Sequence, residues 1–85
     1  MRTFSDEAGR EWVATAREEQ TPRHHGRWFF VMHPADQPAL EFSEPEVRWQ
    51  TAASADRTLR TMSVFELRRR LGVVLGRPGA GRTTG

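Results

Sequence analysis

Phosphate binding is the first chemistry that residue spacing in this chain suggests. The segment from Gly76 to Thr83 has the spacing of a phosphate-binding loop, with Arg82 at the position where such loops carry lysine. That loop must connect a strand to a helix whose N-terminus holds the phosphates. Here a helix is predicted before the segment, so we expect no nucleotide site. Residues 77–85 are predicted instead to form a flexible tail rich in glycine and arginine.

Histidine and carboxylate side chains are the other groups that could catalyse a reaction or hold a metal. His24 and His25 are adjacent, so in a strand their rings would point to opposite faces, and no carboxylate lies at a convincing ligand spacing from them or from His33. Acid–base chemistry by paired carboxylates needs a cleft, which a thin two-layer domain hardly offers, and the chain has no cysteine. We therefore predict that the protein is not an enzyme, with no catalytic, cofactor-binding or metal-binding residues and no cofactor.

Arginine supplies all 13 basic residues of the 85-residue chain, and lysine, isoleucine, asparagine and tyrosine are absent. This usage is typical of a GC-rich genome and is weak evidence for nucleic-acid binding. The distribution of charge is more informative. Residues 1–50 carry 6 arginines and 9 acidic residues, whereas residues 51–85 carry 7 arginines and 2 acidic residues. The pattern predicts a basic C-terminal element on an acidic body.

Alternating apolar residues predict an antiparallel meander in the first 50 residues. The expected strands are Arg2–Ser5, Arg10–Glu18, Arg27–His33, Ala39–Ser43 and Glu46–Trp49. Gly9 is available for positive φ in the first turn, and Pro45 marks an edge or a bulge because it cannot donate to a strand ladder.

Two helices are predicted after Trp49. The first covers Thr51–Thr61, and the second is capped at Ser63 and runs to Leu75, with Glu66 completing a capping box. Its apolar stripe is expected to consist of Val64, Leu67, Leu71, Val74 and Leu75. The fold class is therefore α+β: a meander of three to five strands with one or two C-terminal helices on one face, within a single domain of residues 1–76.

The strand expected over Arg27–His33 is apolar on both faces, which predicts that a partner covers the face without helices. Trp28, Phe29 and Val31 are the expected partner contacts, together with Arg69 and Arg70, which are expected to face water. The first interpretation is thus a small protein–protein interaction module or an accessory subunit of a larger assembly. Its partner would be another protein or a second copy of the chain, and a membrane-associated complex is one of the alternatives.

Nucleic-acid binding is the alternative. In a helix-turn-helix arrangement, Arg68, Arg69 and Arg70 would lie on a recognition helix in a major groove. Base-reading residues usually lie near the N-terminus of such a helix, however, where Val64, Phe65 and Glu66 are found. The sequence shows no signal-peptide pattern and no apolar run long enough to span a membrane, so a cytoplasmic location is expected.

A set of recurring residues resembles a group of small bacterial proteins with no assigned activity. The shared positions are Phe4, Asp6, Gly9, Arg10, Trp12, Val47, Arg48, Trp49, Thr58, Leu59, Met62, Ser63, Glu66, Leu67, Arg68 and Leu71. They cover residues 2 to about 75 and consist of a turn, sheet aromatics and a capped helix. The resemblance supports the predicted fold and implies no catalytic residue.

Overall fold

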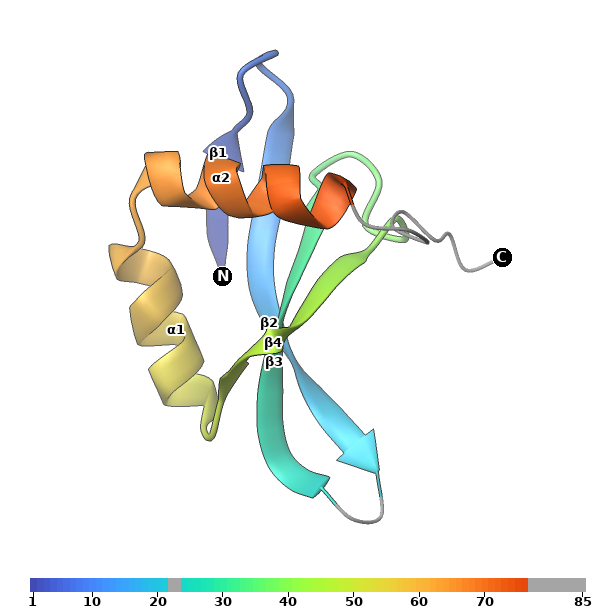
Figure 1. Cartoon of the computed structure of the whole chain (residues 1–85), viewed down its shortest axis with the longest axis vertical. Helices are drawn as coiled ribbons and strands as arrows, with labels where there is room; N and C mark the ends of the chain where they lie inside the picture. The colour runs from blue at the N-terminus through green and yellow to red at the C-terminus, as the bar shows by residue number, and fades with distance from the viewer. Residues whose placement is uncertain (22–23, 77–85) are drawn as a thin grey trace.

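Four antiparallel strands and two helices form the protein, shown by a computed structural model that describes residues 1–21 and 24–76, without the side chains of residues 20–26. The elements are β1 (Arg2–Ser5), β2 (Glu11–Thr21), β3 (His24–Pro34), β4 (Phe42–Trp49), α1 (Ala52–Thr61) and α2 (Val64–Leu75). The strand order β1-β2-β3-β4 is a meander, and both helices pack on one face of the sheet (Figure 1). The predicted α+β fold is confirmed. The predicted tail, residues 77–85, lies outside the described residues.

The last strand differs from the prediction of two separate short strands. Phe30 pairs with Glu44 while Phe29 pairs with Arg48, so the register jumps between these two pairs. The intervening residues, which include Pro45, form a bulge within a single strand. A bulge accommodates proline because its missing N–H is not required by the ladder there.

The core lies between the helices and one face of the sheet. It consists of Phe4, Trp12, Ala14, Phe30, Met32 and Phe42 from the sheet, Leu59 from α1, and Leu67, Leu71 and Val74 from α2. Trp49 packs against this cluster, with its ring centroid 6.1 Å from that of Phe30, and its Nε1–H donates to Thr58 Oγ1 at 3.1 Å. Trp12 is 3% exposed within this core.

The start of α2 follows the predicted cap in part. Ser63 Oγ accepts a hydrogen bond from the Glu66 backbone N–H at 3.1 Å. The Glu66 carboxylate, which a full capping box would turn back toward Ser63, instead accepts from Arg69 at 2.5 and 3.1 Å. This ion pair lowers the pKa of Glu66, chiefly through the Arg69 hydrogen bond. A charge-assisted fork is a stronger interaction than the second half of the capping box.

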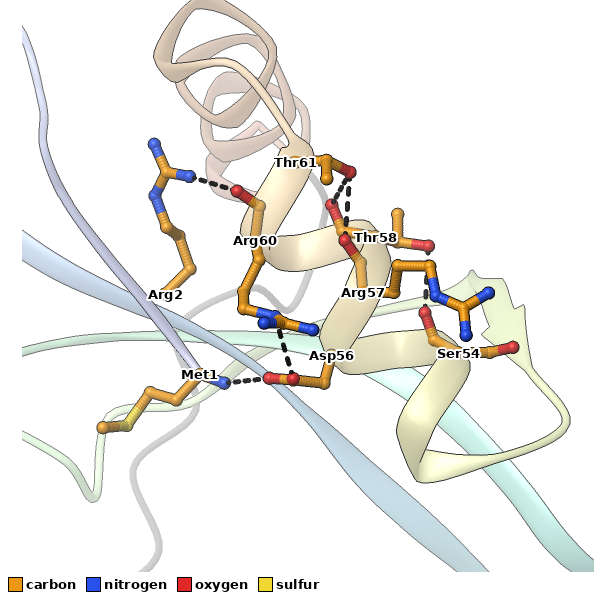
Figure 2. Close-up of polar contacts among 8 residues, drawn as sticks. All are labelled: Met1, Arg2, Ser54, Asp56, Arg57, Thr58, Arg60 and Thr61. Carbon is orange, nitrogen blue, oxygen red and sulfur yellow. Dashed lines mark hydrogen bonds and ion pairs between the residues drawn. The ribbon is translucent and has the colours of Figure 1, made fainter.

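The first strand is bonded to α1 at two points. The Met1 ammonium lies 3.2 Å from Asp56 Oδ1, and Arg2 Nη1 donates to the Arg60 carbonyl at 3.0 Å (Figure 2). The Arg60 carbonyl belongs to the last turn of α1, where carbonyls have no partner within the helix. Arg2 therefore satisfies the end of α1 and holds β1 against it.

The turn between β1 and β2 is organised by one carboxylate. Asp6 Oδ1 accepts from the backbone N–H groups of Ala8 and Arg10, and Asp6 Oδ2 accepts from Trp12 Nε1, all at 2.9 Å. Gly9 takes φ 88°, a conformation that glycine adopts without steric cost, so the predicted positive φ is confirmed. The turn lies next to α2, with which it lines a shared hollow.

This network makes stability depend on pH through Asp6. The Trp12 hydrogen bond, followed by that of the Arg10 N–H, lowers the pKa of Asp6 from its ordinary value of 3.8. A carboxylate with a lowered folded-state pKa contributes its full stabilisation above the ordinary value and loses it as the pH falls through the lowered value. We expect the gap in urea midpoint between the wild-type protein and Asp6→Asn to be constant above about pH 5 and to shrink below about pH 4. A gap that widens in acid would contradict this assignment.

Candidate functional site

The face of the sheet without helices is covered by the protein's own side chains. Val31 is 0% exposed and Phe29 is half-buried. Arg17 on β2 forms an ion pair with Glu41, and since Val31 is paired with Thr15 and Ser43, this ion pair crosses over Val31. Val31 offers no surface to a partner, which corrects its inclusion among the partner contacts.

A second ion pair covers the neighbouring part of this face. Arg48 Nη1 lies 3.5 Å from Glu19 Oε2, so a charged pair again links β4 to β2 across β3. Trp28 points to the other face, where it lies opposite Trp49 and lines a small hollow of about 130 Å³ beneath α1. The three predicted sheet contacts, Trp28, Phe29 and Val31, therefore do not form one patch.

Apart from Met1, the exposed large apolar side chains of the described residues lie on α2. Phe65 is 79% exposed, and Val64, Val73 and Leu75 are exposed as well. Leu67, Leu71 and Val74 form the buried side of the same helix. The expectation that Val64 and Leu75 belong to the buried stripe is wrong, because they lie at its margins. Phe65 and Val73, which fall outside the predicted stripe, are the sequence signal for this second apolar surface.

Two open hollows border this surface where α2 faces the β1–β2 turn. One, of about 380 Å³, is lined by Glu7, Val64, Phe65, Arg68 and Arg69. The other, of about 250 Å³, is lined by Asp6, Glu7, Ala8, Arg68, Leu71, Gly72 and Leu75. Since Glu7 and Arg68 line both hollows, we treat them as one feature, the outer groove, lined by the residues of these two sets.

The three consecutive arginines of α2 have different environments. Arg68 Nε donates to the Ser5 carbonyl at 2.8 Å, which anchors α2 to the end of β1. Arg69 is exposed, as predicted, and its hydrogen bonds to Glu66 raise its pKa. Arg70 does not face water: its side chain is 26% exposed, and Nη1 lies 3.0 Å from Glu44 Oε1. Its role in the fold corrects its inclusion among the partner contacts.

Glu44 is the one buried charged residue in the described part of the chain, with 4% of its surface exposed. It projects from β4 toward α2 at the bulge and accepts a hydrogen bond from Arg70, while its second oxygen, Oε2, has no hydrogen-bond partner among the described residues. A carboxylate in such a place depends on its cationic partner. The Glu44–Arg70 pair therefore holds α2 over β4.

No protein-family model, curated protein or solved structure matches this chain. Its function is therefore inferred from the surfaces described above.

Side chains that could hold a metal ion do not converge in the described residues. Across residues 1–21 and 24–76, no three histidine or acidic side chains lie together as metal ligands would. His33 places Nδ1 2.8 Å from the Pro34 carbonyl oxygen, at the end of β3. Within the same part of the chain, neither helix is long and apolar enough to cross a membrane. The outer groove is therefore the candidate functional site.

Proposed function

We propose that this protein is a non-enzymatic protein–protein interaction module that binds its partner through the outer face of α2. The observation that carries the proposal is the exposure of Phe65, 79% of whose surface is open to water on a well-packed helix. Burying such a ring stabilises association by about 2 kcal/mol. Aromatic side chains, phenylalanine included, are enriched in the cores of protein–protein interfaces.

The support beneath this surface favours binding over simple exposure. Leu67, Leu71 and Val74 anchor α2 to the sheet, and Arg68 and Arg70 bond it to β1 and β4. A rigid helix loses little conformational freedom when its outer face is covered. The outer groove then gives a partner a concave surface next to an exposed aromatic anchor.

Nucleic-acid binding has less support from the same residues. Arg70 is committed to Glu44, and Arg69 shares its charge with Glu66. A nucleic-acid-binding helix needs unpaired cationic side chains along one face to displace counterions from phosphates. Few such side chains remain on α2, and Phe65 lies among them. The alternative stays open to the test below.

Phe65→Ser provides that test. We expect the variant to fold normally and to lose at least about tenfold in affinity for the partner, since a tenfold change corresponds to about 1.4 kcal/mol. Tagged wild-type and variant proteins would be used to capture partners from a native extract, with and without nuclease, and the captured species titrated against each.

Phe29→Ala is the matched control, because Phe29 is a phenylalanine on the helix-free face of the sheet. It should leave capture unchanged. Loss of capture after nuclease treatment, with a steep dependence on salt, would favour the nucleic-acid alternative. Loss of capture in Phe29→Ala but not in Phe65→Ser would place the interface on the sheet and refute the proposal.

A further inference from the structure

Gly72 begins the last turn of α2, and no contact within the described residues explains a glycine there. A Cβ atom built at Gly72 would have no atom within 4 Å beyond its own helix turn and chain neighbours. Glycine is the poorest helix former after proline, because it loses the most backbone freedom on folding. Gly72 also lines the outer groove, in the hollow of about 250 Å³. The space left by the missing side chain therefore opens outward from the protein.

Resting on the proposed function, we infer that the outer groove binds an amphipathic helix of a partner protein, which approaches α2 most closely at Gly72. The exposed apolar residues extend from Val64 to Leu75, about 16 Å along the helix axis at 1.5 Å per residue. This length equals about three turns of a second helix. Because the distance between packed helices is set by the side chains at their contact, a glycine there permits the closest approach.

The charged residues of the groove determine which charge the partner helix should carry along its flank. Arg68 donates to the Ser5 carbonyl, and within residues 1–21 and 24–76 its guanidinium forms no ion pair. Arg69 lies beside it and is exposed. An acidic side chain on the partner helix would give Arg68 the counter-charge that this chain does not supply. Glu7 lines the opposite wall of the groove, so the acidic flank faces α2.

Two other occupants fit the groove less well. A second copy of the chain, related by two-fold symmetry, would add a second Arg68 and Arg69 to the same interface, and gathering these like charges disfavours association. A lipid bilayer is flat and would leave the hollow beside Gly72 unfilled. Glu7 and Glu66, next to the exposed apolar residues, would also repel anionic headgroups.

Gly72→Ala separates a binding role from a structural one. We expect this variant to unfold at higher urea concentration than the wild type, because alanine is the better helix former and its methyl group meets no clash. We expect the same variant to bind a partner helix about tenfold more weakly. A glycine required by the fold would give the opposite change in stability.

The probe is a synthetic 18-residue helix with leucine at positions i, i+3, i+4 and i+7 and glutamate along one flank, the flank that would face Arg68 and Arg69. A matched peptide carries lysine at the flanking positions. In titrations followed by backbone amide chemical shifts, we expect the glutamate peptide to bind with a Kd on the order of 100 µM or tighter and to perturb α2. The lysine peptide should bind at least about fivefold more weakly.

Several results would overturn the inference while leaving the proposed function intact. In the first, a partner is captured by the wild type and lost in Phe65→Ser, but the glutamate peptide does not bind at millimolar concentration. In the second, the peptide binds the wild type and Gly72→Ala equally well. A dimer in sedimentation that Phe65→Ser dissociates would identify a second copy as the occupant. Binding to vesicles of phosphatidylcholine and phosphatidylserine, without peptide binding, would identify a membrane. Capture that is indifferent to Phe65→Ser would refute the proposed function itself.

Discussion

Replacing Arg70 with alanine is expected to lower the free energy of unfolding by about 3 kcal/mol, which is the usual cost of removing one partner from a buried ion pair. Glu44 is 4% exposed, and the hydrogen bond from Arg70 Nη1 at 3.0 Å gives its carboxylate a counter-charge. Without Arg70 the charge would remain buried and unpaired. Urea denaturation followed by tryptophan fluorescence measures the change.

Arg69→Ala is the matched control one residue earlier in the chain. Arg69 forms its ion pair with Glu66 on the surface, so its removal should cost about 0.5 kcal/mol or less. The double variant Glu44→Leu/Arg70→Leu removes both charges and should lie within about 1 kcal/mol of the wild type, since apolar residues often replace a buried pair without loss. Equal effects of Arg70→Ala and Arg69→Ala would show that Glu44 reaches water.

Leu67→Ala is expected to destabilise the protein by about 3 kcal/mol, whereas Phe65→Ala should cost about 0.5 kcal/mol or less. The two side chains lie two residues apart on α2, but Leu67 is fully buried in the core and Phe65 is the most exposed apolar side chain in the described part of the chain. Truncating Leu67 leaves a cavity in the core, whereas truncating Phe65 leaves a space on the surface that water fills. Thermal and urea unfolding of both variants give the comparison.

A large loss of stability in Phe65→Ala would contradict this expectation. It would mean that the outer face of α2 serves the fold, and the basis for a docking surface would be lost. Val73→Ala, at another exposed position of the same helix, tests whether the conclusion extends along the surface. It should behave as Phe65→Ala does.

The meander, both helices and the cap at Ser63 follow from local patterns, because alternation, helical period and capping act within a few residues. The β1–β2 turn could likewise be predicted from Gly9. The bulge in β4 could be predicted only as one of two alternatives, because Pro45 marks an edge or a bulge without saying whether pairing resumes in the same strand. Only the register between Phe29 and Phe30 decides this.

The candidate site was harder to predict because it depends on pairs that are distant in sequence. Glu44 and Arg70 are 26 residues apart, and no periodic pattern connects them. Val31 is covered by an ion pair between Arg17 and Glu41, whose partners lie on either side of its strand. Phe65 could have been recognised, since a large apolar residue outside the buried stripe of a helix is visible in the sequence alone.

The bonds between β1 and α1 have a consequence for the order of events during synthesis. Arg2 can donate to the Arg60 carbonyl only after 58 further residues have been added, and the Met1 ammonium can bind Asp56 only after nearly as many. Contacts between such distant residues form late, because a long loop must close first. We expect β1 to be among the last elements to dock, after the β2–β3 hairpin has already formed.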